Sequence, residues 1–315
     1  MNDDDVVIIG GGAAGLSAAL VLARARRRVT VVDAGRPRNA PAAHMQGFLG
    51  SDGMPPSQLL AAARAEVAGY GGRFVAGTVG GVAARDPSCT TFEIVLDDGS
   101  TLRARRILVA TGLRDEIPPV PGARERWGRD LLHCPYCHGY EVRDQPLGVL
   151  GATAEAVAHA QLVRQWSDDV VLFTDGDLDD EGQRRRLAAR GIGVRDGRVA
   201  RLVVEDDRLT GVELATGERV ARSAVFVRPR FVPHDSLLTH LGCATADSGW
   251  VVVDPRGRTS VAGVWAAGNV VNPRAQVITA AGEGSAAAID INNDLVEDDI
   301  STAVTADTAA TTVAR

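Results

Sequence analysis

Two cysteines and a histidine lie together at residues 134–138, which read Cys-Pro-Tyr-Cys-His. Cysteines separated by two residues can close a small disulfide ring, so Cys134 and Cys137 can hold or release a pair of electrons. His138 follows directly, and histidine is the side chain that ordinarily titrates near neutral pH. Half of a zinc site has the same Cys-x-x-Cys spacing, so this segment alone is compatible with either redox chemistry or metal binding.

A glycine-rich turn far upstream predicts a nucleotide site. The apolar residues 6–9 lead into Gly10, Gly12 and Gly15, which match the pattern Gly-x-Gly-x-x-Gly. The first glycine permits a tight turn, the second lets the backbone approach a pyrophosphate, and the third lets a helix pack on a strand. Residues 16–28 have the apolar stripe of a helix, whose N-terminus would offer N–H groups to phosphates. A second strand at 29–32 ends at Asp33, which can accept hydrogen bonds from ribose hydroxyls.

The order of the expected strands and helices predicts an α/β fold with two Rossmann-like, three-layer (ββα) dinucleotide-binding domains. Residues 147–173 repeat the strand, turn, helix and strand of residues 6–33. Further strands are expected at 73–79, 92–96, 101–109, 193–195, 198–205, 209–214, 224–227, 249–254 and 263–266, and helices at 58–70 and 278–295.

This order of elements divides the chain into four segments. Residues 1–116 form the first part of one nucleotide-binding domain, and residues 246–298 return to it. Between them, residues 117–245 form an inserted domain that carries the Cys pair, entered through the Pro-rich stretch at 117–122, which cannot continue a sheet. Residues 299–315 are mostly Ala, Thr and Val without a packing pattern, and we expect a flexible tail there.

Composition and charge indicate where the protein works and what it does not bind. The chain has 315 residues, of which 45% are hydrophobic, and no apolar run approaches the roughly 18 residues of a membrane span. The acidic N-terminus lacks the features of a secretory signal, which favours the cytoplasm. All 34 basic side chains are Arg, the net charge is −6, and no segment is strongly basic, so neither nucleic-acid nor membrane binding is expected. Cys89 and Cys243 have no partner at ligand spacing and read as buried apolar residues.

From residue 6 to residue 295 the chain resembles the low-molecular-weight thioredoxin reductase family of flavoproteins. The resemblance rests on four blocks in order: residues 10–15, 110–112, the Cys pair, and 263–276. It implies a homodimer, with Cys137 facing the flavin and Cys134 exchanging with substrate. It also implies that FAD is held by Gly10, Gly12, Ala13, Ala14, Gly15, Asp33, Ala110, Thr111, Gly112, Gly268, Asn269, Gln276 and Val277. A flavin next to the Cys pair favours redox chemistry over zinc binding, so no metal is expected.

The chain departs from the family at the turn where the second domain would bind NADPH. The middle glycine of that turn is Thr153, whose branched side chain would stand in the path of the pyrophosphate, and Glu155 adds a negative charge. The His-Arg-Arg segment that grips the 2′-phosphate in the family is replaced by residues 174–177, Thr-Asp-Gly-Asp. Repulsion in place of attraction at a phosphate costs on the order of 2 to 5 kcal/mol. We therefore expect NADPH to bind poorly or not at all.

Two further departures concern His138 and Asn269. NADPH-dependent thioredoxin reductases have Asp after the second cysteine, whereas a neutral His138 can take a proton from a thiol at pH 7. Asn269 replaces the Asp that lies against the ribityl chain and can still bond a hydroxyl. The segment 134–141 resembles the dithiol oxidases that close disulfides in dithiolopyrrolone and gliotoxin-type natural products, the holomycin-forming type above all.

The resemblance predicts an FAD-dependent oxidation of a small-molecule dithiol, with O2 as acceptor and H2O2 as product. Cys134, Cys137 and His138 are the predicted catalytic residues, and His133 and His44 are alternative proton carriers. The alternatives on the same scaffold are an NADPH-dependent thioredoxin or other disulfide reductase, a reductase with another electron donor such as a ferredoxin, and a flavin-binding sensor without enzymatic activity.

Overall fold

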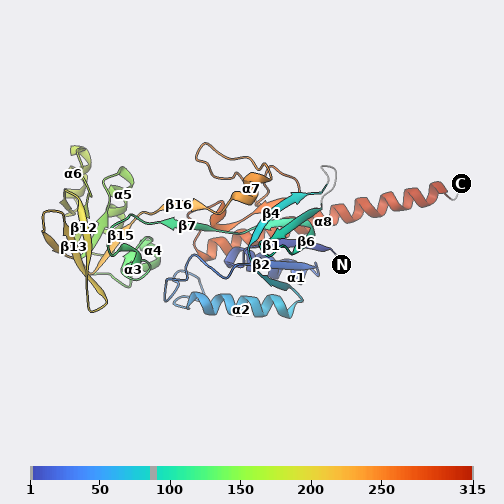
Figure 1. The fold of residues 1–315 in the computed structure, drawn as a ribbon, viewed down its shortest axis with the longest axis horizontal. Helices are drawn as coiled ribbons and strands as arrows, with labels where there is room; N and C mark the ends of the chain where they lie inside the picture. The colour runs from blue at the N-terminus through green and yellow to red at the C-terminus, as the bar shows by residue number, and fades with distance from the viewer. Residues whose placement is uncertain (1–2, 86–90, 314–315) are drawn as a thin grey trace. The chain divides into compact units, whose positions relative to one another are not determined.

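The computed structural model of the chain describes residues 3–85 and 91–313. Contacts divide it into two compact units: Met1–Arg38, Ser57–Arg114 and Pro233–Arg315 form the first, and Asn39–Pro56 and Asp115–Val232 form the second (Figure 1). The chain passes between the units four times. Two of these passages lie in strands β7 (Leu113–Glu116) and β16 (Arg230–Pro233), which pair with each other.

The first unit is built on a seven-stranded sheet of order β3-β2-β1-β6-β5-β4, with β17 also paired to β6. Strands β3, β2, β1, β6 and β17 run parallel, whereas β5 and β4 are antiparallel additions. Its strands are β1 Asp4–Ile9, β2 Val29–Asp33, β3 Arg73–Ala76, β4 Val79–Ala84, β5 Phe92–Leu96, β6 Thr101–Val109 and β17 Val264–Ala266. Its helices are α1 Ala13–Arg24, α2 Pro56–Gly69, α7 Ser236–His240, the short 3-10 helix η1 Gly268–Val270, and α8 Val277–Val313.

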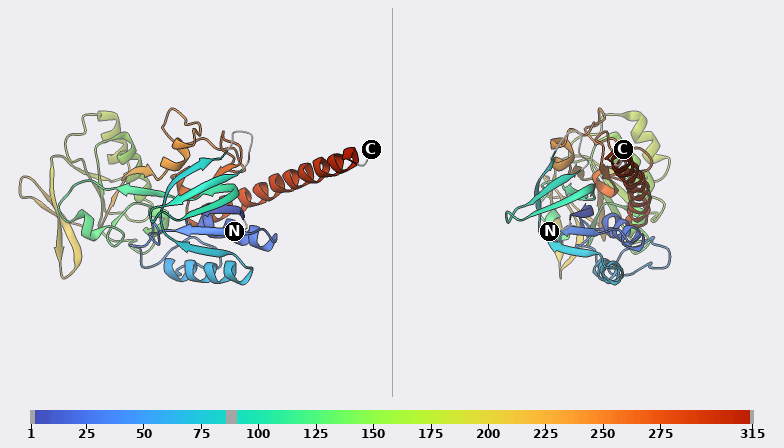
Figure 2. Two further views of the ribbon diagram at one scale, coloured as in Figure 1. Left: turned by 45° about the vertical axis from the view of Figure 1, so that its right-hand side comes forward. Right: turned by 90° about the vertical axis from the view of Figure 1, so that its right-hand side faces the viewer.

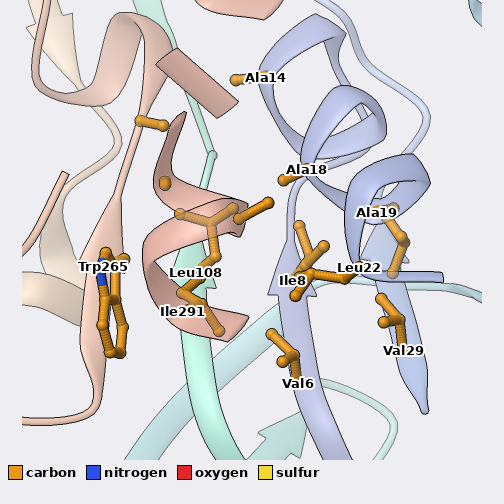
Figure 3. Packing of buried hydrophobic residues seen from close by; sticks show 14 of the residues in the cluster. Val6, Ile8, Ala14, Ala18, Ala19, Leu22, Val29, Leu108, Trp265 and Ile291 are labelled. Atoms are coloured by element: carbon orange, nitrogen blue, oxygen red, sulfur yellow. The ribbon is translucent and has the colours of Figure 1, made fainter. Parts of the chain in front are cut away.

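Strand β1 is apolar on both faces because both faces of the sheet are covered. Val6 and Ile8 point to the side of helices α1 and α8, where Ile291 of α8 is fully buried (Figure 3). Val7 and Ile9 point to the opposite face, whose core includes Leu237 and Leu238 of α7. These two leucines explain why residues 233–245 belong to the first unit, although the sequence predicted that the inserted domain extends to residue 245.

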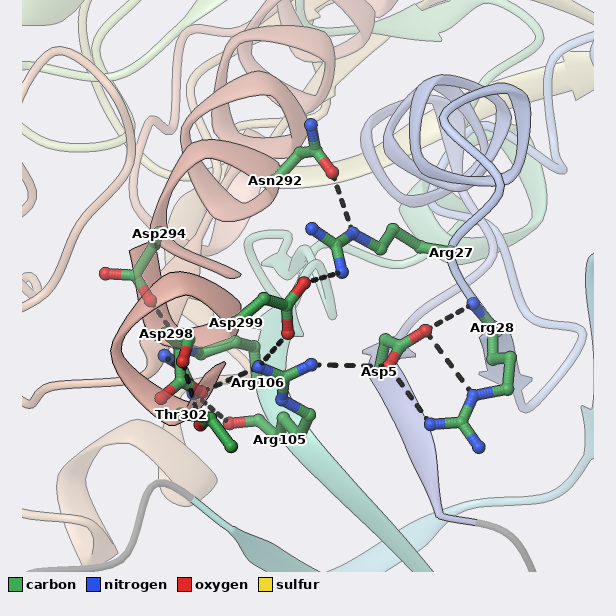
Figure 4. A network of polar contacts seen from close by, with 10 residues as sticks. All are labelled: Asp5, Arg27, Arg28, Arg105, Arg106, Asn292, Asp294, Asp298, Asp299 and Thr302. Atoms are coloured by element: carbon green, nitrogen blue, oxygen red, sulfur yellow. Dashed lines mark hydrogen bonds and ion pairs between the residues drawn. The ribbon is translucent and has the colours of Figure 1, made fainter. Parts of the chain in front are cut away.

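Helix α8 continues from Val277 to Val313, whereas the sequence predicted a helix over residues 278–295. An ion-pair network anchors its middle part (Figure 4). The guanidinium of Arg106 is buried and pairs with Asp294 and Asp298, and Arg105 pairs with Asp298 across 2.8 Å. Alanine has the highest helix propensity, so the Ala-rich sequence beyond the network is suited to continue the helix.

The second unit is a five-stranded parallel sheet of order β11-β10-β9-β15-β8, accompanied by a three-stranded antiparallel sheet of order β12-β13-β14. The parallel strands are β8 Leu131–Leu132, β9 Leu147–Leu150, β10 Val170–Phe173, β11 Gly193–Arg195 and β15 Ala224–Val227. The others are β12 Val199–Glu205, β13 Arg208–Leu214 and β14 Arg219–Ala221, and the helices are α3 Ala123–Arg126, α4 Pro135–His138, α5 Ala154–Val163 and α6 Glu181–Ala188.

The α/β class and the two Rossmann-like units predicted from the sequence are confirmed. Two of the predicted strands differ from those in the structure. The strand expected at 73–79 is divided, because β3 ends at Ala76 and β4 begins at Val79. The strand expected at 249–254 is only an isolated bridge between Thr245 and Val251, since Gly249 turns the chain back with a φ of 80°.

The structure describes one of the two cysteines outside the pair. Cys243 is a free thiol buried in the first unit, as predicted, and burial raises its pKa above the ordinary value. Cys89 lies outside the described residues.

Candidate active site

The Cys pair is a disulfide in the second unit, and the Cα atoms of Cys134 and Cys137 lie 5.2 Å apart. Strand β8 leads to Cys134, which is the N-cap of α4. Proline suits the first position of a helix, since no hydrogen bond is lost there, and Pro135 occupies it. The N–H of Cys137 donates to the Cys134 carbonyl across 3.1 Å, so this single turn holds the two sulfur atoms together.

Trp166 supports this turn from outside. A Cβ atom at Gly139 would lie 2.8 Å from the Trp166 ring and 2.5 Å from the Pro135 carbonyl oxygen, so only glycine fits there. The ring of Tyr136 meets Trp166 edge-on, with ring centroids 5.5 Å apart. Gly139 and Trp166 are supporting residues that sequence reading missed, because nothing in the motif indicates what packs on it.

His138 ends the same helical turn. Its backbone N–H donates to the Cys134 carbonyl across 3.1 Å, and residues at i and i+4 lie on the same face of a helix. Burial lowers the pKa of His138 below its ordinary value of 6.5, and Glu141 opposes this shift. The imidazole is therefore neutral at pH 7 and can accept a proton.

Two further histidines lie behind the turn. His133 precedes Cys134, and its Nδ1 lies 3.2 Å from the carbonyl oxygen of Val227, which fixes Nδ1 as a donor. His159 on α5 is buried, with its ring 6.0 Å from that of His133. Burial lowers the pKa of His159 to about 4. His44, the other alternative considered from the sequence, is exposed in the segment Asn39–Pro56 of the same unit.

The first glycine turn lies in the first unit and has the conformation that nucleotide binding requires. Gly10 has a φ of 111°, and a Cβ there would lie 2.3 Å from the Ala110 carbonyl oxygen; a Cβ at Gly15 would lie 1.9 Å from the Gly10 carbonyl oxygen. A Cβ at Gly12, in contrast, would meet no described protein atom within 4 Å. Packing within the chain thus explains two of the glycines, and the open space at the third is where the predicted pyrophosphate contact would lie.

Asp33 lies at the end of β2 beside a cavity of about 470 Å³. Its carboxylate accepts a hydrogen bond from the N–H of Gly11 across 3.1 Å and pairs with Arg64. The cavity is lined by Asp33, Ala34, Gly35, Arg36, Arg64, Phe74, Ala76, Gly77 and Thr78. A carboxylate has about four acceptor positions, so Asp33 retains capacity for a ribose hydroxyl, and the cavity is suited to an adenosine.

The block 110–112 joins this turn from the neighbouring strand. The N–H of Ala110 donates to the Ile9 carbonyl across 2.7 Å, and Gly112 has a φ of 70°. His234 clamps the block: the Thr111 hydroxyl donates to its carbonyl across 2.6 Å, and its N–H donates to the Gly112 carbonyl across 3.0 Å. No pattern in the sequence pointed to His234, because it lies far along the chain and outside any motif.

The fourth block completes the arrangement around α1. A Cβ at Gly268 would lie 3.0 Å from the Ala14 Cβ, which places Gly268 against the start of α1. Glu283 accepts from the Gly268 N–H across 2.9 Å and from the Asn272 amide across 2.6 Å. The Asn269 amide donates to the carbonyls of residues 272 and 275, and its oxygen accepts from Arg38. Its contact with the ribityl chain stays a prediction.

The start of α8 adds the last predicted cofactor residues, Gln276 and Val277. The Gln276 carbonyl accepts the N–H of Ala280 across 2.8 Å, so Gln276 caps the helix and Val277 begins it. The structure thus brings the glycine turn, block 110–112 and Gly268 together in one unit, whereas Cys134, Cys137 and His138 lie in the other. The cofactor-binding and catalytic roles of these residues stay predictions.

The second glycine turn, at residues 151–156, is closed by the chain's own side chains. Thr153 caps α5, and its hydroxyl accepts from the Ala156 N–H across 3.3 Å. Hydrogen bonds from its own backbone N–H and from the Thr153 hydroxyl lower the pKa of Glu155, and Arg228 adds a smaller attraction. The Ala156 N–H, which would face a phosphate, therefore meets a hydroxyl of the protein itself, and Glu155 adds a negative charge to the same turn.

Comparison with known proteins identifies the family of this chain. The family model of the pyridine nucleotide-disulphide oxidoreductases matches residues 4–284. The chain belongs to this family. Thioredoxin reductase sirT of Leptosphaeria maculans is 29% identical to it, over 88% of this chain and 90% of the relative. Thioredoxin reductase tcpT of Claviceps purpurea is 31% identical, over 81% of this chain and 83% of the relative.

Solved structures of this family agree. HlmI, for which a crystal structure is solved, is 61% identical in sequence to this chain. The two structures match with a TM-score of 0.95, over 99% of this chain and 98% of that chain. A putative thioredoxin reductase TrxB from Bacillus anthracis is 34% identical, with a TM-score of 0.89, over 93% and 99% of the two chains. Oxidoreductases of this thioredoxin reductase type are flavoproteins, and FAD is the cofactor, as predicted. Within residues 3–85 and 91–313, no helix is long and apolar enough to span a membrane.

Proposed function

We propose that this oxidoreductase uses FAD to convert a small-molecule dithiol, of dithiolopyrrolone or similar type, into an intramolecular disulfide, with O2 as the electron acceptor. We also propose that it works in the cytoplasm as a homodimer. The observation that carries the proposal is the closed turn at residues 151–156, where Thr153 and Glu155 take up the groups that would hold a nucleotide phosphate. If NADPH cannot deliver electrons, a dithiol is a source that the redox-active Cys pair can accept them from.

The charges around that turn support the same conclusion. Asp175 and Asp177, both exposed, follow strand β10, where the family has the cations that grip the 2′-phosphate of NADPH. The carboxylate of Glu155 neutralises part of the field of Arg228, a cation near the turn. A phosphate that approached this edge of the sheet would meet three carboxylates, and like-charge contacts of this kind suppress binding.

The chemistry of the disulfide is two successive thiol exchanges. A substrate thiolate attacks the Sγ atom of Cys134, which breaks the bond to Cys137 and leaves a mixed disulfide between substrate and Cys134. The second substrate thiol loses its proton and attacks the substrate sulfur, so the cyclic disulfide forms and Cys134 leaves as a thiolate. Two electrons have then passed from the dithiol to the two cysteines.

His138 supplies the base for this sequence. It lies one helical turn after Cys134 and is neutral at pH 7, so it can take the proton of the attacking thiol. An Asp at this position, with an ordinary pKa near 3.9, would be a poor base at neutral pH.

FAD fits the first unit. The N-terminus of α1 and Gly12 would hold its pyrophosphate, and the cavity beside Asp33 would hold its adenosine. Bound FAD supplies a two-electron acceptor that returns Cys134 and Cys137 to the disulfide and can itself be reoxidised by O2, which yields H2O2.

One experiment under anaerobic conditions tests the direction of electron flow. The purified yellow protein is mixed either with excess NADPH or with a reduced dithiolopyrrolone, and the flavin absorbance is followed. We expect the dithiol to bleach the flavin and the admission of air to restore the colour with production of H2O2. Rapid bleaching by NADPH would show that the chain is a reductase instead.

The variants Cys134→Ser and Cys137→Ser are the matched controls. Each should retain the yellow colour, since FAD is held in the other unit, and each should lose turnover with the dithiol. Bleaching of either variant by the dithiol at the rate of the unchanged protein would remove the disulfide from the reaction.

A further inference from the structure

His159 is a buried histidine that the proposed reaction does not use. It lies on α5 and is only 6% exposed, and neither of its ring nitrogens has a hydrogen-bond partner among the described residues. A buried polar group without a partner costs stability, so packing alone does not explain a histidine at this position. The neutral ring offers one nitrogen as a donor and the other as an acceptor, and both are available to a group that arrives during the reaction.

The neighbours of His159 connect it to the Cys pair. Its ring centroid lies 6.0 Å from that of His133 and 6.1 Å from that of Phe226. His133 directly precedes Cys134, so the Cα atoms of these two residues are about 3.8 Å apart. Figures 1 and 2 show the green and yellow parts of the chain, which carry α4, α5 and β15, within the second unit. One side chain therefore separates His159 from the residue beside the disulfide.

The imidazole of His133 is held in one tautomer. Its Nδ1 lies 3.2 Å from the carbonyl oxygen of Val227, the last residue of β15, and a carbonyl can only accept, so Nδ1 carries the hydrogen. The ring of Phe231 meets it edge-on, with centroids 5.1 Å apart. Nε2 is then the proton-accepting nitrogen of the neutral ring. Strands β8 and β15 are parallel neighbours, so His133 lies at the carboxyl edge of the sheet, where ligands bind in open α/β folds.

The surroundings of His159 keep its ring neutral. Burial, more than repulsion from His133 and Arg228, lowers the pKa of His159 to about 4, and the backbone of His133 opposes this shift. These are the titratable and charged groups that face His159 among the described residues, and Glu155 at the start of α5 is attracted to Arg228. At pH 7 His159 therefore does not compete for protons, and its ring can still accept an N–H.

The proposed oxidation releases two protons, one from each thiol of the substrate. In the first exchange the proton of the attacking thiol passes to His138, the bond between Cys134 and Cys137 breaks, and a bond between the substrate and Cys134 forms. The thiolate left on Cys137 favours the charged form of the neighbouring His138, so this base is occupied when the second thiol reacts. The second exchange therefore calls for another proton acceptor beside Cys134.

We infer that His159 is a positioning residue for a second proton transfer, which His133 carries out; this inference rests on the proposed function. The second thiol gives its proton to Nε2 of His133, its sulfur closes the cyclic disulfide, and Cys134 leaves as a thiolate. The dithiol has then lost two electrons, which the two cysteines hold. Both nitrogens of His133 carry hydrogen at that moment, and a ring nitrogen of His159 accepts the new N–H after a small ring rotation. The hydrogen bond that His159 lacks at rest thus forms during turnover.

Rapid-quench mass spectrometry of the full-length, FAD-loaded protein separates the two exchanges. The protein is mixed without oxygen at pH 7 with 2-mercaptoethanol, which can make only the first exchange, or with a reduced dithiolopyrrolone, which makes both. N-ethylmaleimide stops the reaction. With the dithiol, His159→Phe should slow release of the cyclic disulfide about tenfold or more. The mixed disulfide on Cys134 should accumulate as one substrate mass added to the 33.0 kDa chain, whereas the exchange with 2-mercaptoethanol should keep its rate.

Three further variants test the role of the acceptor. His159→Gln retains an acceptor oxygen and should release the cyclic disulfide at nearly the rate of the unchanged chain. His133→Asn can still donate to the Val227 carbonyl but takes no proton, so it should accumulate the same mixed disulfide. Raising the pH to 9 should restore release in both slow variants, because the substrate thiol then ionises without a base. His240→Phe, at an exposed position of α7, is the control and should alter neither exchange.

Two results overturn the inference: equal slowing of both exchanges in His159→Phe, and release at pH 7 without accumulation of the mixed disulfide. A defect that persists at pH 9 overturns it as well, because a merely structural role would not depend on pH. Flavin colour and far-ultraviolet circular dichroism confirm the fold of every variant. If the unchanged chain exchanges with 2-mercaptoethanol and yet forms no cyclic disulfide from the dithiol, the proposed function itself is wrong, and the inference fails with it.

Discussion

The backbone N–H of His138 donates to the carbonyl oxygen of Cys134 across 3.1 Å, so one helical turn joins the proposed base to the proposed exchanging cysteine. The hydrogen bond that forms the turn therefore also sets the separation of the two groups. On our proposal, a substrate thiol that attacks Cys134 is one helical turn away from the imidazole that takes its proton.

Replacing His138 should separate base catalysis from thiol exchange. We expect His138→Ala to lower kcat/KM for the dithiol about 100-fold or more at pH 7, because general-base catalysis contributes factors of that size. The neutral imidazole is the active form and its pKa is lowered by burial, so the unchanged enzyme should lose activity only as the pH falls below 6.5. A pH profile from 5 to 9 checks this.

The same profile contains its own control. In His138→Ala the acidic limb should disappear, and the rate should rise toward the pKa of the free thiol, about 8.5. An unchanged limb in the variant would assign that proton to another group, with His133 as the next candidate.

Gly12 and Gly15 should respond differently to an added side chain. Gly12→Val places its side chain where no described protein atom lies, so the apoprotein should unfold at nearly the same temperature and yet fail to bind FAD. Gly15→Ala puts a methyl group 1.9 Å from the Gly10 carbonyl oxygen and should destabilise the fold itself. Thermal unfolding of both apoproteins, followed by titration with FAD, distinguishes the cases; equal loss of stability would remove Gly12 from the cofactor site.

His159 should make stability depend on pH. Its pKa is about 4 in the folded protein against 6.5 ordinarily, so the folded state disfavours the protonated form. Stability is then greatest above pH 6.5 and falls as the pH drops from 6.5 toward 4. The full loss is about 3 kcal/mol, since each pKa unit corresponds to about 1.36 kcal/mol.

Urea unfolding at pH 7.5, 6, 5 and 4 measures this effect. In His159→Phe the decrease between pH 6.5 and pH 4 should be smaller by that amount, since the side chain no longer titrates. Both ring nitrogens of His159 lack a hydrogen-bond partner among the described residues, so the variant should be no less stable than the unchanged chain at pH 7.5. A decrease as steep as that of the unchanged chain would show that other groups cause it.

The ion-pair network should stabilise the middle of α8. Asp298→Ala leaves Arg105 and the buried Arg106 with one partner fewer and should lower the free energy of unfolding by about 1 to 3 kcal/mol. Glu297→Ala, at the exposed neighbouring position, should change it by less than about 0.5 kcal/mol. Equal effects of the two substitutions in chemical unfolding would show that the network contributes nothing.

Local patterns allowed much of this architecture to be predicted from the sequence. The strand, turn and helix around Gly10 and the strand 101–109 have periodicities that depend only on neighbouring residues. The Cys pair was equally visible, because its chemistry lies within five consecutive residues. These are the parts in which local propensity and the final packing agree.

The remaining parts depend on contacts between distant residues. His234 clamps block 110–112 and Glu283 holds Gly268, yet neither residue belongs to a motif. The helix beyond residue 295 is anchored by arginines almost two hundred positions earlier, such as Arg106. Residues 300–313 lie beyond these ion pairs, and there the high helix propensity of alanine, and not an apolar stripe, favours the helix.

The closed turn at residues 151–156 has a consequence for how this family is classified. The second unit retains its five-stranded parallel sheet and the helix α5 that follows the turn, so a complete nucleotide-binding fold persists here as the carrier of two sulfur atoms. On our proposal, a hydroxyl and a carboxylate at one turn decide whether such a protein takes electrons from a coenzyme or from its substrate. On the same proposal, oxidases and reductases on this scaffold can be very close relatives that differ at the residues of this turn.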